Sequence, residues 1–290
     1  MALSASSFSS KTFCAEVQRA RPAMGTFVDI SATGPNSEWV EHAIEKAFGA
    51  IEQVDHLMSF HNVNSELSLL NRDAMRKPQS VHPLTYAVLK RAVEIGAASD
   101  GVFDITIAPL LVEVGLLPRT NEAVTPGGNW RALKLMGDCR VFFEQPILLD
   151  LGGIAKGFAV DQAIHVLRRA GCTDAVVNAG GDLRRFGKKR HPIYLRRNTG
   201  LVQVAELRCG AIATSSPYAN IPDRIAQPIG CIVDPKQRRA WNGNGSVMIA
   251  ARSCMIADAL TKVAALAGPA CQPILDRFGA QAMWDSDENV

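Results

Sequence analysis

The sequence predicts an α+β fold, in which helices and strands are mixed without a regular order. Three observations support this class. Apolar residues recur at helical spacing over 37–58, short strand patterns separated by turns fill much of 190–250, and a last helix over 255–267 stops at Gly268-Pro269. The regular strand–helix alternation that is typical of a doubly wound parallel sheet is not seen.

The first half of the chain is predicted to contain two long helices and several short strands. The helix over 37–58 has a continuous apolar face, and Gly34-Pro35 separates it from the preceding strand. Ser80 or His82 lies near the start of the second helix, and Asp100-Gly101 ends it. In order, the predicted elements are a strand over 26–32, helices over 37–58 and 83–98, and strands over 142–143 and 147–149.

The second half begins with a strand that runs into a glycine-rich loop, DLGGIAKG over 150–157. A helix with an apolar face follows, and Gly171 ends it where a left-handed residue is favoured. A short buried strand over 175–177 leads into a second glycine turn, NAGGD over 178–182. Further short strands are predicted around 193–197, 201–207, 211–214, 230–233 and 246–250.

The composition is that of a globular protein with a sizeable core. Of 290 residues, 47% are hydrophobic and 20% are charged, which excludes disorder, collagen and coiled coil. The formal net charge of +3 is too small to indicate nucleic acid or an anionic membrane as the main partner. We expect the Ser-rich residues 1–22 to form a flexible segment and residues 23–290 to form a single domain.

Cysteine spacing and the N-terminal residues predict a cytoplasmic protein. The closest two of the seven cysteines, Cys254 and Cys271, are 17 residues apart, which provides no zinc ligand set and fits reduced thiols. The N-terminus lacks the basic start and apolar run of an export signal, and no apolar stretch approaches the ~18 residues of a membrane helix. The alternative is a misplaced start codon that hides such a signal.

The glycine-rich loop has two interpretations. It joins a strand to a helix, so its free backbone N–H groups suit a phosphate. It is neither a Walker loop nor the dinucleotide fingerprint, because its glycines stand at 152, 153 and 157. The alternative is a tight strand-to-helix turn with Lys156 in solvent, and spacing alone favours neither.

Two carboxylates also have a structural and a functional interpretation each. Asp104, among apolar residues in FDIT, either caps local backbone or contacts a ligand. Asp258 and Lys262 are four residues apart on the last helix, which fits an ion pair, while the Asp258 carboxylate is also a hard oxygen ligand for Mg²⁺. Spacing does not decide between these alternatives. No histidine pair of metal-binding spacing and no Gly-x-Ser-x-Gly elbow occurs in the sequence, so a hydrolase triad has no support.

Taken together, an ordered series of segments resembles the FAD:protein FMN transferase family, also called ApbE-like. The resemblance extends from about residue 22 to 268. Its segments are AMGT (23–26), MSFHNVNSELSLLN (58–71), DGVFDITIAP (100–109), DLGGIAKGFAVD (150–161), VNAGGD (177–182), VDP (233–235) and ADAL (257–260).

The resemblance implies a Mg²⁺-dependent transfer of FMN from FAD to a Ser or Thr hydroxyl of an acceptor redox protein, with release of AMP. It implies mixed sheets with packed helices and an FAD cleft between two lobes. Mg²⁺ is expected on Asp258 and the carbonyl oxygen of Gly153. A glycine loop, a lysine and a metal ion suit phosphoryl transfer, which needs positioning and charge neutralisation. The implied FAD contacts are Met24, His61, Val102, Phe103, Asp104, Asp150, Lys156 and the backbone of Val233.

Three positions depart from the family pattern. Gly230 and Cys231 stand where the family has a Ser-His pair, whose His is the usual base. Cys231 can act as the base only if its thiolate is stabilised; otherwise it is a small buried side chain that fills space in the core. Lys262 stands where the family has a Thr, so its ammonium either replaces a charge of the metal or repels it, and Thr261 is the candidate ligand instead. His61 replaces a Tyr and still offers a ring for stacking.

The first hypothesis is therefore a flavin transferase. The second, motivated by the departures at 230–231 and 262, is a flavin-binding or flavin-supplying protein without transfer chemistry. The third is a pyrophosphatase that splits FAD with water. Covalent FMN on an acceptor, binding without turnover, and free FMN with AMP distinguish the three.

Overall fold

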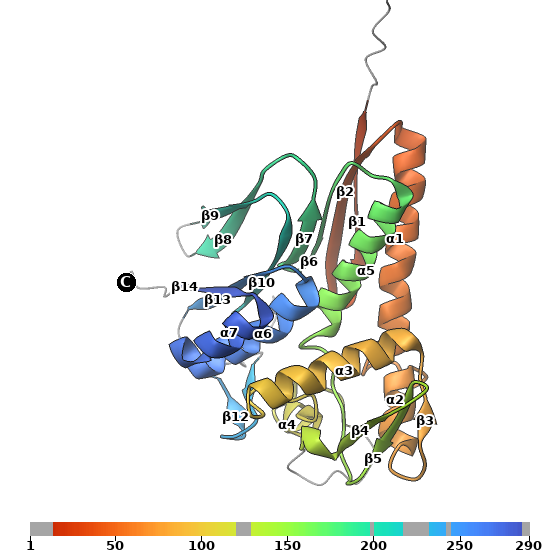
Figure 1. The fold of residues 1–290 in the computed structure, drawn as a ribbon, viewed down its shortest axis with the longest axis vertical. Helices are drawn as coiled ribbons and strands as arrows, with labels where there is room; N and C mark the ends of the chain where they lie inside the picture. The colour runs from red at the N-terminus through yellow and green to blue at the C-terminus, as the bar shows by residue number, and fades with distance from the viewer. Residues whose placement is uncertain (1–13, 120–128, 198–199, 217–231, 242–244, 286–290) are drawn as a thin grey trace, which may run out of the picture.

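The computed structural model describes residues 14–119, 129–197, 200–216, 232–241 and 245–285 of the chain. A seven-stranded sheet forms its centre, in the order β1-β2-β6-β7-β10-β13-β14, and all neighbouring strands are antiparallel (Figure 1). The strands are β1 (Ala15–Ala23), β2 (Thr26–Gly34), β6 (Asp174–Ala179), β7 (Asp182–Phe186), β10 (Gly210–Ser215), β13 (Ser246–Ala251) and β14 (Gln281–Asp285).

Three helices, α1 (Ser37–Met58), α5 (Ala155–Ala170) and α6 (Cys254–Ala267), cover one face of this sheet (Figure 1). α1 packs against β1 and β2, α5 against β6 and β7, and α6 against β10 and β13. α5 contacts both other helices, so the apolar faces of all three helices enclose one main core. Gly171 ends α5 with a left-handed φ of 91°, as the sequence predicts.

The hairpin of β8 (His191–Arg197) and β9 (Gly200–Leu207) adds a smaller core to the sheet. On β10 and β13, alternate side chains enter different cores: Ala211 and Ala213 belong to the main core, and Ile212 to the smaller one. Since successive side chains of a strand point to opposite faces, the hairpin covers the face that the helices leave open.

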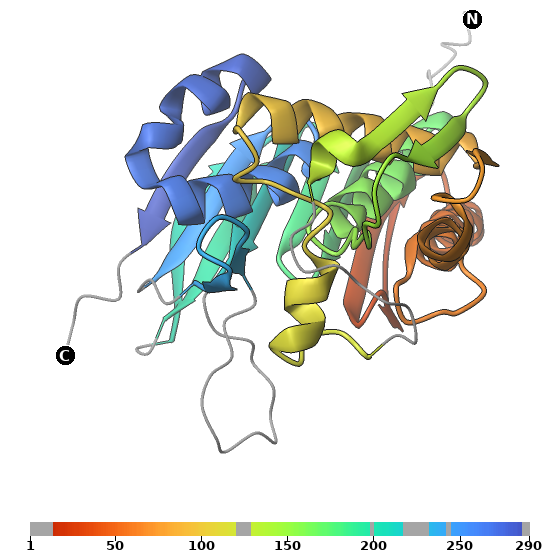
Figure 2. The ribbon, with the colours of Figure 1, turned by 90° about the horizontal axis from the view of Figure 1, so that it is seen from below.

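The chain between α1 and α5 forms a further layer at one end of the helices, where α3 reaches from α1 to α6 (Figures 1 and 2). His82 begins α3, its Nδ1 accepting from the Leu84 N–H at 3.1 Å. This layer contains α2 (Glu66–Asp73), α3 (Pro83–Ala98), α4 (Ala108–Glu113), the 3₁₀ turn Trp130–Ala132 and a sheet of β3 (Gln79–Ser80), β5 (Arg140–Phe143) and β4 (Leu133–Met136). Later elements are β11 (Val233–Asp234), β12 (Arg239–Ala240), the 3₁₀ turn Gly268–Cys271 and α7 (Gln272–Phe278).

Two local predictions are wrong. Residues 15–22, expected to be flexible, are part of β1, which pairs with β2 from Ala15↔Gly34 to Ala23↔Thr26. Residues 147–149 lie outside any strand, because the Asn71 side chain bonds the backbone N–H and carbonyl of Leu149 at 2.8 and 3.0 Å in place of a neighbouring strand.

Residues Cys254–Phe278 are long and apolar enough to cross a membrane by composition, with a mean hydropathy of 1.3. However, 61% of the most apolar window is buried within the fold. Helix α6 packs on the sheet and ends at Ala267, before Gly268-Pro269. These features are typical of a core helix.

Candidate functional site

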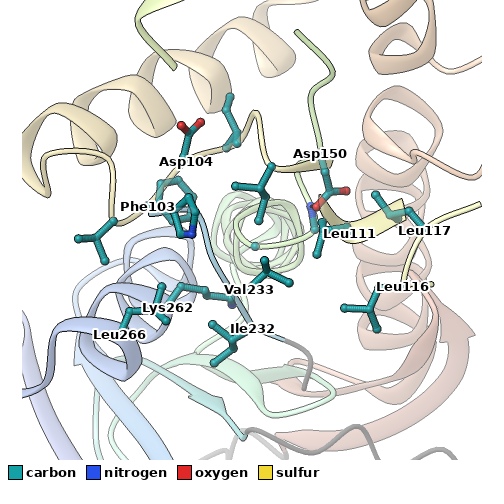
Figure 3. Close-up of a pocket in the computed structure, with 16 residues that line it drawn as sticks. Phe103, Asp104, Leu111, Leu116, Leu117, Asp150, Ile232, Val233, Lys262 and Leu266 are labelled. Atoms are coloured by element: carbon teal, nitrogen blue, oxygen red, sulfur yellow. The ribbon is translucent and has the colours of Figure 1, made fainter. Parts of the chain in front are cut away.

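A pocket of about 230 Å³ lies where the segment before α4, the glycine-rich loop and α6 meet (Figure 3). Its lining is largely apolar, and its polar residues are few: Asp104, Asp150 and Lys262, beside the backbone of Gly152 and Gly153. An apolar cavity with a few converging polar groups is typical of a small-ligand site. The apolar walls include Phe103, Leu111, Leu116, Leu117, Ile232, Val233 and Leu266.

The glycine-rich loop turns sharply from the pocket into α5. The Gly152 N–H donates to Asp150 Oδ2 at 3.1 Å, and the Ala155 N–H donates to the Leu151 carbonyl at 2.8 Å. The N-cap residue of α5, Ile154, makes no capping hydrogen bond with its side chain. The Gly157 N–H, in the first turn, instead donates to Asp258 Oδ2 on α6 at 3.1 Å.

The two helices cap each other. Asp161, one turn after Gly157 on α5, accepts from the Cys254 and Met255 N–H groups at 2.8 and 3.0 Å at the start of α6. Asp258, one turn after Cys254 on α6, caps α5 in return. A negative carboxylate at a helix N-terminus is favourable, so this exchange fixes the two helices relative to each other.

Gly157 is required where the helices cross. A methyl group there would lie 2.3 Å from the Cys254 carbonyl oxygen and 2.8 Å from Cβ of Asp258. Only glycine permits this approach. The third glycine of the loop therefore has a packing role, whereas Gly152 and Gly153 line the pocket.

Two ion pairs stand beside the loop. Lys156 Nζ bonds Asp182 Oδ2, and Lys262 Nζ bonds Asp258 Oδ1. The side chains of Asp182 and Asp258 are 3% and 0% exposed. Because Lys156 is paired with the buried Asp182, the alternative in which Lys156 lies free in solvent is wrong. The pair predicted between Asp258 and Lys262 is present, but its carboxylate is buried instead of lying at the surface.

Burial and neighbouring charges shift the pKa values of these groups. Burial raises the pKa of Asp182 to about 6, and the Asp258 carboxylate adds to this rise against the opposing lysines. Burial alone would raise the pKa of Asp258, but Lys262 and Lys156 hold it below its usual value. Burial opposes a charged Lys156, yet Asp182 and Asp258 outweigh it and raise its pKa.

The two carboxylates of the pocket wall have different partners. Asp104 Oδ1 accepts from the N–H and hydroxyl of Thr106 at 2.8 and 2.7 Å, which is the capping role, and Asp104 also lines the pocket. Burial raises the pKa of Asp104 above its ordinary value. Burial likewise raises the pKa of Asp150 to about 6, partly offset by the Gly152 N–H and then by the charges of His61 and Lys262.

The structure brings together most of the predicted ligand residues. Six of them line the pocket: Val102, Phe103, Asp104, Asp150, Gly153 and Val233. Lys156, Asp258 and Thr261 do not line the pocket, although Asp258 bonds Lys262, which does. Cys231, the predicted base, lies outside the described residues.

Met24 and His61 do not line the pocket. Met24 and Gly25, with φ of 52° and 71°, form the two-residue turn between β1 and β2. A left-handed non-glycine residue such as Met24 is uncommon. His61 is exposed, and its charge lowers the pKa of Asp150. Their predicted flavin contacts stay predictions.

The predicted Mg²⁺ ligands do not fit a metal in this arrangement. Lys262 bonds both Oδ1 and the carbonyl oxygen of Asp258. The Thr261 hydroxyl donates to that carbonyl at 2.6 Å and lies 2.7 Å from Ser215 Oγ, away from the pocket lining. Within the described ranges, no group of three or more His, Cys, Asp or Glu side chains is placed to hold a metal ion.

Sequence reasoning missed several residues of this site. From the sequence Asp182 is only the end of a glycine turn, although an acidic residue that begins a strand after Gly-Gly is a usable signal. Leu116 and Leu117, which follow the left-handed Gly115, carried no signal beyond their hydrophobicity. The role of Asp161 follows only from the helix crossing.

An α+β fold with an apolar pocket beside a glycine-rich loop, and two pairs of a lysine with a buried carboxylate, defines a protein with a small-ligand site. The chain belongs to the ApbE family, whose model matches residues 24–284.

Curated relatives and solved structures resemble nearly the whole chain. The FAD:protein FMN transferase of Vibrio cholerae is 28% identical over 84% of this chain and 79% of the relative, and that of Escherichia coli K12 is 23% identical over 85% and 77%. The ApbE protein of Thermotoga maritima superposes with a TM-score of 0.82 at 23% identity, covering 95% of this chain and 96% of that one. The flavin transferase ApbE of Vibrio cholerae has a TM-score of 0.77 at 24% identity, covering 94% of each chain. The predicted ApbE-like α+β fold is confirmed.

Proposed function

We propose that this protein transfers FMN from FAD to an acceptor protein. The observation that carries the proposal is the position of the pocket: the apolar walls around Phe103 and Val233 adjoin the glycine-rich loop and Lys262. A ligand that joins a flat ring to a pyrophosphate would use both parts at once. Relatives named FAD:protein FMN transferase, similar over most of their length, support the same reaction.

In the proposed reaction, a Ser or Thr hydroxyl oxygen of the acceptor attacks the phosphorus on the riboflavin side of FAD. The new oxygen–phosphorus bond forms as the bond to the bridging oxygen breaks, and AMP leaves with that oxygen. The hydroxyl proton passes to a base, for which Cys231 is the sequence prediction. Phosphoryl transfer depends on positioning and charge neutralisation, which the loop and the lysines Lys156 and Lys262 would supply.

Mg²⁺ stays a prediction of the resemblance. When bound, a divalent ion would neutralise phosphate charge. The contacts of Asp258 and Thr261 argue against it, since Lys262 bonds Asp258 Oδ1, the Gly157 N–H donates to Oδ2, and the Thr261 hydroxyl donates to the Asp258 carbonyl. The cytoplasmic location likewise stays a proposal, and fractionation of cells with an antibody to the chain would test it.

The Lys262–Asp258 pair also supports a second candidate, a flavin-binding protein that does not carry out transfer. A mass assay with FAD and a Ser/Thr-containing acceptor protein separates the candidates. We expect a mass gain on the acceptor equal to FMN, with one AMP released per transfer. FAD binding without a mass gain, across several acceptors, would support the second candidate, and free FMN with AMP would indicate a pyrophosphatase.

The pocket itself is tested by Phe103→Ala, with Phe142→Ala as the matched control. Phe142 is half-buried on β5 and does not line the pocket. We expect Phe103→Ala to weaken FAD binding at least about tenfold, because an aromatic wall is lost, while the control binds as wild type. If the chain binds no FAD, or both variants bind equally well, the proposal is wrong.

A further inference from the structure

Lys262 lies in the pocket wall on α6, one helical turn after Asp258 (Figure 3). Its Nζ bonds Asp258 Oδ1 and also the Asp258 carbonyl oxygen, the latter at 3.1 Å. The Asp258 side chain is fully buried, whereas 21% of the Lys262 side chain remains exposed. The lysine therefore neutralises a buried carboxylate and still has access to the pocket.

The glycine-rich loop approaches the same lysine. A methyl group on Gly153 would lie 3.6 Å from Cε of Lys262 and 3.5 Å from the Phe103 ring. Gly153 therefore lies beside the methylene chain of Lys262, and the loop, this lysine and the Phe103 ring meet in the same part of the pocket lining. The charge of Lys262 also lowers the pKa of Asp150 and of Asp182, against the larger effect of burial.

We propose that the Lys262 ammonium is the resident cation of this site and that the chain binds the pyrophosphate of FAD without a divalent metal ion. The proposal rests on the proposed function, since it names the cation of the same site. An ammonium has three N–H donors, and Asp258 accepts two of them, which leaves one for a phosphate oxygen.

Electrostatics excludes a simple coexistence of lysine and metal. A divalent ion bound to Asp258 Oδ1 would lie within a few ångströms of the ammonium that bonds the same oxygen. Two like charges at that distance in a buried site repel strongly, so metal and lysine compete for the carboxylate. Removing the ammonium while keeping an oxygen nearby should create a metal requirement.

The first measurement is the affinity of the wild-type chain for FAD, read from flavin fluorescence in EDTA and then in excess MgCl₂. We expect the two dissociation constants to agree within about twofold, because the cation belongs to the chain. Bound metal is measured separately by electron paramagnetic resonance, with Mn²⁺ as the probe and FAD present. We expect no stoichiometric Mn²⁺ on the wild type.

Two variants and a control then isolate the ammonium. Lys262→Thr places a hydroxyl one turn from Asp258. We expect this variant to bind FAD at least about tenfold more weakly than wild type in EDTA, and Mg²⁺ to restore the affinity. We also expect it to bind Mn²⁺ stoichiometrically. Lys262→Arg keeps the charge and should bind FAD independently of metal. Lys236→Met is the control, because Lys236 pairs with Asp100 at the surface and is 54% exposed.

The outcomes separate this inference from the proposed function. If FAD binds to wild type only with Mg²⁺, or Mn²⁺ binds equally to wild type and Lys262→Thr, the resident-cation proposal is overturned while flavin binding stands. If wild type binds no FAD under either condition, the proposed function itself fails. Should Lys262→Thr not fold, the wild-type comparison in EDTA and the Lys262→Arg variant still decide the question.

Discussion

Replacing Gly157 with alanine tests whether the contact between α5 and α6 holds the site together. The new methyl group would stand 2.3 Å from the Cys254 carbonyl oxygen and 2.8 Å from Cβ of Asp258. Ordinary contact requires the helices to separate by about 1 Å. That movement would also break the hydrogen bond from the Gly157 N–H to Asp258 Oδ2, now 3.1 Å long.

The magnitude follows from three effects. Forcing a methyl group into a packed interface costs about 1–3 kcal/mol. Losing a hydrogen bond to a charged group costs about 1.5–3 kcal/mol. The higher helix propensity of alanine over glycine returns about 0.5–1 kcal/mol. We therefore expect Gly157→Ala to lower the free energy of unfolding by roughly 2–5 kcal/mol, a large part of a typical total.

Urea unfolding followed by circular dichroism measures this change, and Gly49→Ala is the matched control. Gly49 is an exposed residue of α1 with nothing within 4 Å of an added methyl group, so the same substitution should stabilise the chain by about 0.5–1 kcal/mol. We also expect weaker FAD binding for Gly157→Ala, since α6 carries Lys262. A Gly157→Ala variant as stable as wild type would refute the packing argument.

Three further substitutions test individual groups. Burial raises the folded-state pKa of Asp150 to about 6, so the chain gains stability as pH falls through 6 towards the ordinary value of 3.8. Asp150→Asn should therefore raise the free energy of unfolding by roughly 1–2 kcal/mol at pH 7.5 and by almost nothing at pH 4. Equal effects of the substitution at both pH values in urea titrations would contradict this. Asp161→Ala should lower the free energy of unfolding by roughly 2–5 kcal/mol and weaken FAD binding, because the Asp161 bonds to the start of α6 and the Arg184 pair at 2.5 Å are lost. Asp161→Asn should lower the free energy of unfolding by less. Calorimetry that shows equal stability for the two variants would count against the capping role. Cys231→Ala should slow transfer to an acceptor by about 10²–10⁴-fold with FAD affinity unchanged, and a normal rate in the mass assay would remove Cys231 as the base.

The long elements of the fold could be predicted from periodicity and end signals. The helices over 37–58 and 83–98 begin and end where the sequence predicts, because their apolar faces are continuous and their ends carry strong signals. Edge strands could not be predicted in this way. β1 is half-exposed and rich in charge, so its pattern resembles a surface segment until β2 is known to pair with it.

The candidate site could be predicted only in part. Phe103, Asp150 and Gly153, which line the pocket, are predictable because the motifs that contain them resemble those of a family. The contacts that shift the pKa values of the charged groups could not be predicted. Whether Lys262 is a solvated helix residue or the partner of a fully buried carboxylate depends on how α6 packs, which is a tertiary property.

The reciprocal caps explain why packing and electrostatics are inseparable in this site. Asp258 supports the N-terminus of α5 through one carboxylate oxygen and holds Lys262 through the other. A buried carboxylate without such partners is strongly disfavoured, and α5 supplies the Gly157 N–H that Oδ2 accepts, so separating the helices would remove one of the two bonds that stabilise the charge of Asp258. The glycine at 157 permits that contact. Consequently the feature that positions the pocket cation is the crossing of two helices, and substitutions distant from the ligand but within this crossing should alter flavin binding.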